Sequence, residues 1–199
     1  MGADVESFAC DVTKRAEVDT AMAATLERFG RVDACFANAG GGGFRGASHM
    51  TDNATWQDTI DLNITSVVNT WSAVTNHMMA RGSGKLIVTS SAAALMGTAG
   101  AAGYSTTKAA VVGLTQALAV ELGQANIQVN AILPGFVETE MSLTTSDEFQ
   151  AAARRRSVLG RIGTFEDMEG IAVFLASKHS DYLTGQGIVI DGGHTIFPI

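Results

Sequence analysis

Short apolar runs alternate with longer segments of helical periodicity along the chain. In the longer segments, apolar residues recur every three or four positions, which places them on one face of a helix. This pattern predicts helices over 14–29, 55–79 and 104–122 and a short helix that starts at Thr164. The shorter runs predict strands over 7–12, 32–37, 85–90, 127–133 and 187–190. Strands with few polar residues, separated by helices, indicate an α/β fold: a doubly wound parallel sheet with helices on both faces.

The composition excludes several classes of protein. Apolar residues make up 46% and charged residues 17% of the 199 residues, which excludes a disordered chain. No apolar stretch reaches about 18 residues, so we expect no membrane partner. The net charge of −7, with one basic cluster at 154–156, argues against nucleic acid as a partner. The length favours a single domain over 1–199, and without a visible secretory signal we expect a cytoplasmic location.

The cysteines and histidines do not form a metal site in the sequence. Cys10 and Cys35 lie in apolar segments and lack metal-ligand spacing, and the four histidines are scattered. We therefore expect buried thiols in a reducing compartment and no metal.

The residues directly after the predicted strands are the candidates for chemistry, because ligands bind beyond the carboxyl ends of an open parallel sheet. They are Asp11 and Val12, Asn38 to Gly40, Ser91, Pro134 and Gly135, and Asp191. Tyr104 and Lys108 open the next helix with a spacing of four, so they share a face. Asn63 lies near the apolar stripe of the 55–79 helix, where a polar side chain needs a partner.

A serine, a tyrosine and a lysine at the strand ends predict proton transfer to or from an alcohol. The pKa of a free tyrosine is near 10, and bringing such a pKa to about 7 takes roughly 4 kcal/mol. An ammonium about 4 Å away supplies about that much at an effective dielectric constant near 20. Tyr104 would be the acid/base, Lys108 its tuner and Ser91 a hydrogen-bond donor to the carbonyl or alkoxide. An ordinary surface pair explains Tyr104 and Lys108 equally well when they are taken alone.

Together these motifs resemble the short-chain dehydrogenase/reductase family in its single-domain branch. The matching segments are Asn38-Ala39-Gly40, Asn63 in DLNIT, Ser91 in IVTSS, Tyr104 to Lys108, and PGFVET from Pro134 to Thr139. The resemblance runs from about residue 4 to residue 193. It implies a Rossmann-like fold, NAD or NADP as cofactor, and a small alcohol or carbonyl compound as substrate.

The resemblance also implies roles for single residues. Asn63, Ser91, Tyr104 and Lys108 would form a catalytic tetrad, in which Lys108 and Tyr104 also contact the cofactor and Asn63 supports a water in a proton relay. Asp11 and Val12 would meet the adenine. The cofactor cleft would be lined by Asn38, Ala39 and Gly40, although Asn38 also has a purely structural interpretation. The nicotinamide side would be Pro134, Gly135, Val137 and Thr139.

One departure from the family pattern is large. Members begin with a strand and a glycine-rich turn, T-G-x-x-x-G-x-G, and no segment of this sequence matches it. The sequence starts at what resembles the third strand, so we expect an N-terminally truncated, incomplete domain that lacks roughly 50 to 60 residues. Either the 7–12 strand then pairs with the 32–37 strand, or the chain is a fragment. The choice between NAD and NADP is unreadable, because the residue that decides it normally lies on the missing second strand.

The expected function is NAD(P)-dependent hydride transfer between a secondary alcohol and a ketone, with Tyr104 as acid/base. One alternative is a cofactor-deficient relative that acts as a non-catalytic subunit or binding module. Another is sugar-nucleotide epimerisation or dehydration, although the 60 residues after Thr139 are few for a separate substrate lobe. We expect a substrate lid over 141–161. Because the 104–122 helix is apolar on more than one side, we also expect a homotetramer or homodimer.

Overall fold

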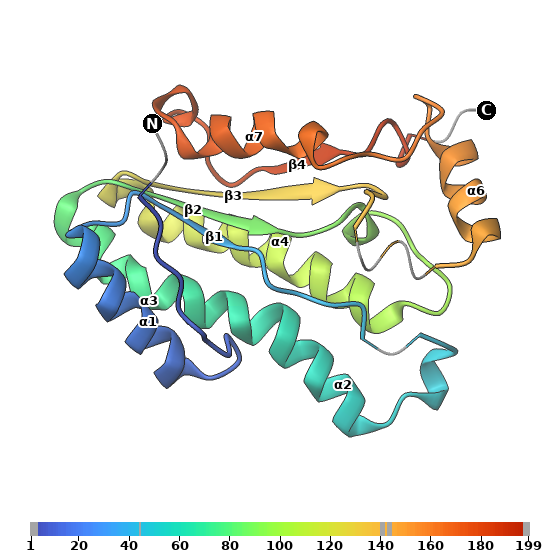
Figure 1. The fold of residues 1–199 in the computed structure, drawn as a ribbon, viewed down its shortest axis with the longest axis horizontal. Helices are drawn as coiled ribbons and strands as arrows, with labels where there is room; N and C mark the ends of the chain where they lie inside the picture. The colour runs from blue at the N-terminus through green and yellow to red at the C-terminus, as the bar shows by residue number, and fades with distance from the viewer. Residues whose placement is uncertain (1–3, 44, 140–141, 143–144, 197–199) are drawn as a thin grey trace.

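A four-stranded parallel sheet forms the centre of the computed structural model, which describes residues 4–43, 45–139, 142 and 145–196. The strands are β1 (Ala34–Ala37), β2 (Gly84–Thr89), β3 (Ile127–Pro134) and β4 (Gly187–Ile190), and they lie in this order across the sheet. Each strand pairs in parallel with the next. Figure 1 shows α7 on one face of the sheet and α1, α3 and α4 on the other. The expected doubly wound α/β fold is therefore confirmed.

The helices largely follow the predicted apolar stripes, except α6 (Asp147–Arg156), which lies in the segment expected as a lid and was not predicted as a helix. They are α1 (Arg15–Phe29), α2 (Asn53–Ile60), α3 (Ser66–Arg81), α4 (Ala102–Leu122), α6 (Asp147–Arg156) and α7 (Glu166–Ala176). One prediction needs correction, because the single helix expected over 55–79 is divided. A π-helical turn, Asp61–Thr65, separates α2 from α3. Periodicity could not reveal it, since one extra residue in a turn barely disturbs an apolar stripe.

The central strands are buried on both faces, which is why they contain few polar residues. On one face, Leu86 of β2 and Val129 of β3 pack with Met78 of α3 and Val111 of α4. On the other face, a smaller cluster of Ile87, Ile132 and Leu175 lies beneath α7. These two clusters fix the sheet between its helical layers and hold the strand ends in place.

The two cysteines differ in burial. Cys35 on β1 is buried, and this burial raises the pKa of its thiol to about 11. Cys10 is half-buried, and desolvation followed by the charges of Glu17 and Asp11 raises the pKa of its thiol. A thiol with a raised pKa carries little thiolate at neutral pH, so neither cysteine has the character of a nucleophile.

The prediction of a strand over 7–12 is wrong. The described residues form no strand there, and among them β1 pairs with β2 alone. The segment is held instead by an ion pair between Asp4 and Arg28 of α1, and by a hydrogen bond of 3.0 Å from Asn69 Nδ2 to the Val12 carbonyl. Apolar side chains alone do not make a strand, because a strand also needs a neighbour that pairs with its backbone.

The helices that the structure describes include none that is long and apolar enough to span a membrane.

Candidate active site

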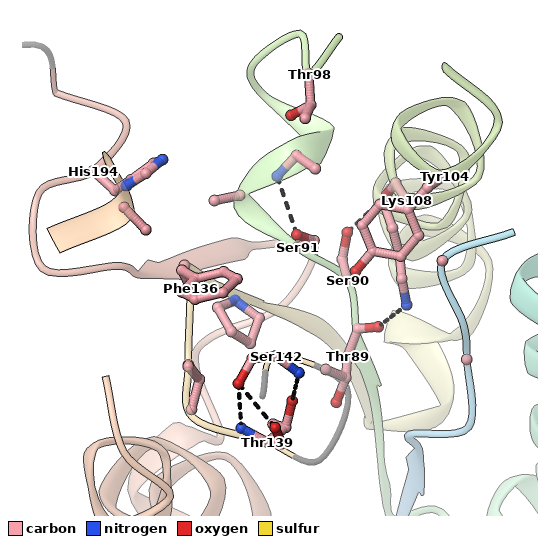
Figure 2. Close-up of a pocket in the computed structure, with 18 of the residues that line it drawn as sticks. Thr89, Ser90, Ser91, Thr98, Tyr104, Lys108, Phe136, Thr139, Ser142 and His194 are labelled. Carbon is pink, nitrogen blue, oxygen red and sulfur yellow. Dashed lines mark hydrogen bonds between the residues drawn. The ribbon is translucent and has the colours of Figure 1, made fainter. Parts of the chain in front are cut away.

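The carboxyl ends of the four strands open into one large cleft of about 1410 Å³. Residues at and beyond the strand ends line it: Asn38 after β1, Ser90 and Ser91 after β2, Pro134 at the end of β3 with Gly135 after it, and His194 after β4. Figure 2 shows side chains from the end of β2, from α4 and from the C-terminal turn around this opening. The location agrees with the rule that ligands bind beyond the carboxyl ends of parallel strands.

Tyr104 and Lys108 lie side by side near the start of α4 (Figure 2). The Lys108 Nζ is 5.6 Å from the centroid of the Tyr104 ring and donates a hydrogen bond of 2.8 Å to the Thr89 carbonyl. Lys108 is only 5% exposed. Because burial penalises the charged ammonium, the pKa of Lys108 is lowered to about 8. The predicted pair therefore exists as a buried cation beneath a phenol, and it is not an ordinary surface pair.

Ser91 begins a short 3-10 turn, Ala92–Ala94, directly after β2. Its Oγ accepts a hydrogen bond of 3.1 Å from the Ala93 backbone N–H. A hydroxyl that accepts through one lone pair can still donate its own hydrogen. Ser91 lines the cleft together with Tyr104, so its O–H can donate to an oxygen that binds between them.

Asn63 is 1% exposed and lies in the π-helical turn, behind the wall of the cleft. Its Oδ1 accepts from the Gly41 N–H at 3.1 Å, and its Nδ2 donates to the carbonyls of Gly41 at 3.0 Å and Thr59 at 2.9 Å. The expected need for polar partners is thus met by the glycine loop, residues 40–43, and by Thr59 near the end of α2. Wide turns of this kind are frequent at functional sites, because they redirect a side chain out of the helical register.

The Asn38-Ala39-Gly40 segment crosses the end of β1 and enters the glycine loop. Asn38 Oδ1 accepts a hydrogen bond of 2.7 Å from the Thr89 hydroxyl, which ties the ends of β1 and β2 together. Asn38 and Gly40 line the cleft, whereas Ala39 does not. Asn38 therefore has the structural role considered from the sequence and is also exposed to a ligand.

The segment after β3 forms the opposite wall. Pro134, Gly135, Val137 and Thr139, the residues expected on the nicotinamide side, all line the cleft. Thr139 is fixed by Ser142: the Thr139 N–H donates to Ser142 Oγ at 2.7 Å, and the Ser142 N–H donates to Thr139 Oγ1 at 3.1 Å (Figure 2). This reciprocal pair holds the chain at the edge of the cleft.

Asp11 and Val12 lie outside this cleft. The Asp11 carboxylate is exposed and accepts hydrogen bonds from the side chain and the backbone N–H of Thr13, which lower the pKa of Asp11. The Val12 carbonyl is held by Asn69 at 3.0 Å. The structure therefore anchors these two residues locally and does not bring them to the predicted tetrad.

Other lining residues were not singled out as site residues from the sequence. They include Arg45, Thr98, Phe136, Ser142 and His194. His194 directly follows Asp191-Gly192-Gly193, so the rule about strand ends could have found it. Thr145, Phe149, Ala152 and Arg156, from the segment predicted as a lid, also line the cleft, while residues 141, 143 and 144 of that segment lie outside the described residues. Within the described ranges, no group of three or more His, Cys, Asp or Glu residues could hold a metal ion.

The residues present fit the nicotinamide and ribose part of a dinucleotide. A Cβ added at Gly40 would lie 3.0 Å from Asn63 Oδ1 and 3.1 Å from Lys108 Nζ, so the absence of a side chain lets this backbone pack directly against the amide and the buried ammonium. A Cβ at Gly135 would lie 2.7 Å from the Asp191 Cα. Both glycines let the walls of the cleft pack closely against these neighbours, and the buried ammonium beside Gly40 is a donor for ribose hydroxyls.

Comparison with known proteins identifies the family. The sequence model described as enoyl-(acyl carrier protein) reductase matches residues 1–195. The 3-oxoacyl-[acyl-carrier-protein] reductase of Chlamydia pneumoniae is 36% identical over 195 residues, which are 98% of this chain and 78% of that protein. The chain belongs to the short-chain dehydrogenase/reductase family. The short-chain reductase protein NovJ of Streptomyces niveus, another member, is 38% identical over 96% of this chain and 75% of its own length.

Solved structures of other short-chain dehydrogenases/reductases share the fold closely. A putative gluconate dehydrogenase from Agrobacterium tumefaciens superposes with a TM-score of 0.92 at 37% identity, covering 98% of this chain and 77% of that one. A gluconate 5-dehydrogenase from Burkholderia cenocepacia, solved with NADP and tartrate, has a TM-score of 0.89 at 33% identity and covers 94% of this chain and 74% of that one. These similarities confirm the predicted family, the Rossmann-like fold and the class of NAD(P)-dependent oxidoreductase.

Proposed function

We propose that this short-chain dehydrogenase/reductase interconverts a small secondary alcohol and its ketone. The observation that carries the proposal is the Tyr104–Lys108 pair, which lies on one face of α4 and lines the same cleft as Ser91. The NAD or NADP cofactor, when bound, supplies or accepts the hydride. The chain's own residues then have to orient the carbonyl and move one proton.

Tyr104 is proposed as the group that moves the proton. In reduction its phenol O–H donates to the carbonyl oxygen, and in oxidation its oxygen takes the hydroxyl proton. The Lys108 ammonium, 5.6 Å from the ring centroid, stabilises the negative charge that develops on the phenol oxygen. The Ser91 hydroxyl donates to the same substrate oxygen and holds it in place.

Asn63 is proposed as a positioning residue. Both hydrogens of its side-chain amide are used by the Gly41 and Thr59 carbonyls. We therefore assign Asn63 to fixing the Gly40–Gly41 backbone against Lys108, which differs from the water relay that the resemblance implied.

The proposed cofactor contacts extend along the strand ends. Pro134, Gly135, Val137 and Thr139 would meet the nicotinamide, and Asn38 and Gly40 would line the other wall beside the ribose. Tyr104 and Lys108 would meet the ribose from α4. We propose that Asp11, Val12 and Ala39 contact the end of the cofactor that extends beyond the cleft.

Titration with NADH and NADPH separately, followed by calorimetry, is the first test of this function. We expect one of them to bind with a micromolar or lower Kd and its absorbance to fall when a ketone is added. Binding without turnover of any ketone or secondary alcohol would favour the alternative, a non-catalytic binding module. Absence of binding to a chain that circular dichroism shows to be folded would contradict the proposal.

Gly40→Ala should lower kcat/KM by about tenfold, because the new Cβ must displace Asn63 Oδ1 or Lys108 Nζ from distances of 3.0 and 3.1 Å. Steady-state kinetics of the purified variant would measure this. Gly170→Ala on α7 is the matched control, since a Cβ there meets nothing within 4 Å. It should keep the kinetics of the parent and gain about 0.5–1 kcal/mol of stability from its helical position. Parental kinetics for Gly40→Ala would show that the wall beside Lys108 tolerates a side chain.

We further propose that the chain forms a homotetramer or homodimer in the cytoplasm. The face of α4 that points away from the sheet exposes Ala109, Gly113 and Val120, and Val120 is 83% exposed. A long helix with an apolar outer face gains by packing against a second copy.

A further inference from the structure

His194 is placed in the cleft by the turn that follows β4. In the view of Figure 2, the His194 ring and Tyr104 lie on opposite sides of Ser91, and they come from different parts of the chain. The proposed cofactor contacts of the cleft come from the ends of β1 and β3 and from α4, whereas His194 follows β4. The side chain therefore belongs to a separate part of the wall, whose role the function proposed above does not assign.

The backbone around His194 is held at several points. The Asp191 carboxylate accepts from the N–H of Gly193 at 2.8 Å and from the N–H of Thr195 at 2.7 Å. The Gly192 carbonyl accepts from Ser157 Oγ at 3.2 Å and from the Leu159 N–H at 3.1 Å. Gly192 and Gly193 have positive φ angles of 61° and 81°, which favour glycine. A turn fixed in this way presents its side chain with little loss of entropy when a ligand binds.

The imidazole has the character of a neutral hydrogen-bonding group. Burial lowers the pKa of His194, the positive charge of Arg156 lowers it further, and the Asp191 carboxylate opposes both. A neutral imidazole offers one N–H donor and one nitrogen acceptor. Within the part of the chain that the structure describes, no residue forms a hydrogen bond with either ring nitrogen.

His194 lies beside Arg156 in the cleft, and apolar side chains supply further parts of its lining. Met96, Phe136 and Phe149 line the same cleft and offer no strong hydrogen-bonding group. A substrate that is apolar beyond its reacting carbonyl would leave the imidazole without a partner when it displaces water. A substrate with a further oxygen would satisfy it.

We propose that His194 is a specificity-determining residue that binds a second oxygen of the substrate, a hydroxyl or carbonyl away from the reacting carbon. The substrate class is then a hydroxyketone or diketone and not a simple alkyl ketone. This inference rests on the proposed function, since it requires that the cleft reduces ketones.

The test compares cyclohexanone with cyclohexanedione and the positional isomers of hydroxycyclohexanone, in the parent and in His194→Phe. We expect the parent to prefer at least one oxygenated ketone. His194→Phe should lower kcat/KM for that ketone about tenfold, mainly through KM, and change kcat/KM for cyclohexanone less than about twofold. His194→Gln, which keeps a donor and an acceptor, should retain most of the preference, and His194→Ala replaces the Phe variant if that one fails to fold. His179→Phe, at an exposed position of the Lys178–Ser180 turn, is the matched control and should change neither constant.

The outcomes separate the inference from the proposed function. If the parent reduces cyclohexanone but shows no higher kcat/KM for any of the oxygenated ketones, the proposed role of His194 is wrong, while the proposed function still holds. A His194→Phe variant with equal losses for all ketones, or with weaker NADPH binding by calorimetry, also overturns it. A parent that binds cofactor but reduces none of these ketones overturns the proposed function and the inference together.

Discussion

Tyr104→Phe should lower kcat by roughly a thousandfold while the chain stays folded. The substitution removes the hydroxyl that we assign to proton transfer, and general acid–base groups contribute about a hundredfold to ten-thousandfold to rate. The ring remains, so its contact with the Lys108 ammonium at 5.6 Å is kept. Turnover, the thermal midpoint and the calorimetric Kd for NADPH should be measured together. We expect only the first to change substantially.

Tyr182→Phe provides the control for this substitution. Tyr182 is the other tyrosine of the chain, is fully exposed and lies near the 3-10 turn that follows α7. Its variant should keep the kcat of the parent. If Tyr104→Phe kept that rate as well, another group would have to move the proton and the proposed mechanism would fail.

Lys108→Met should abolish turnover and at the same time stabilise the fold near neutral pH. Burial lowers the pKa of Lys108 from 10.5 to about 8. This shift means that the charged ammonium destabilises the folded chain by roughly 3 kcal/mol. Methionine has a similar volume and no charge. The lost hydrogen bond to the Thr89 carbonyl offsets about 1.5 kcal/mol of the gain. A net increase of about 1–2 kcal/mol in the free energy of unfolding should follow, measurable by urea denaturation.

This increase should depend on pH in a definite direction. Between about pH 8 and pH 10.5 the folded parent has released the Lys108 proton, while the unfolded chain still binds it. The stability of the parent therefore rises with pH across this range, and the advantage of Lys108→Met shrinks. Lys178→Met, at an exposed position, should show no such dependence relative to the parent. The assignment of a buried ammonium that destabilises the fold would be contradicted by either of two results. One is a difference in free energy of unfolding between Lys108→Met and the parent that stays constant with pH, and the other is a Lys108→Met variant that is less stable than the parent.

The fold could be predicted from the sequence wherever the burial of an element determines its pattern of apolar residues. β2 and β3 lie between two helical layers, and Leu86 and Val129 therefore stand in runs without polar residues. The 7–12 segment has similar apolar content, but it lacks a neighbouring strand, and pairing is a property of two segments. The π-helical turn was missed because a sequence pattern records which face a residue occupies and not how many residues a turn contains.

The candidate site could be predicted in part. Ser91, Tyr104 and Lys108 line one cleft, because two of them share a helix face and the third ends a neighbouring strand. The partners of Asn63 depend on the conformation of the glycine loop, where Gly43 has a φ of 61°. His194 depends on a turn that returns to the cleft after β4. Such positions are set by backbone dihedrals and long-range contacts, which no local pattern encodes.

The π-helical turn between α2 and α3 also holds one residue more than a regular α-helical turn. Because the wider turn absorbs this residue, removing one residue from Asp61–Thr65 would close a regular α-turn with little rotation of α2 relative to α3, but it would move Asn63 away from Gly41. Asn63 joins the turn to Gly41, and Thr59 on α2 accepts from the same amide. The glycine loop thus takes its position from a residue count rather than from packing alone, and a change of length within this turn would act on the cleft without replacing any residue that lines it.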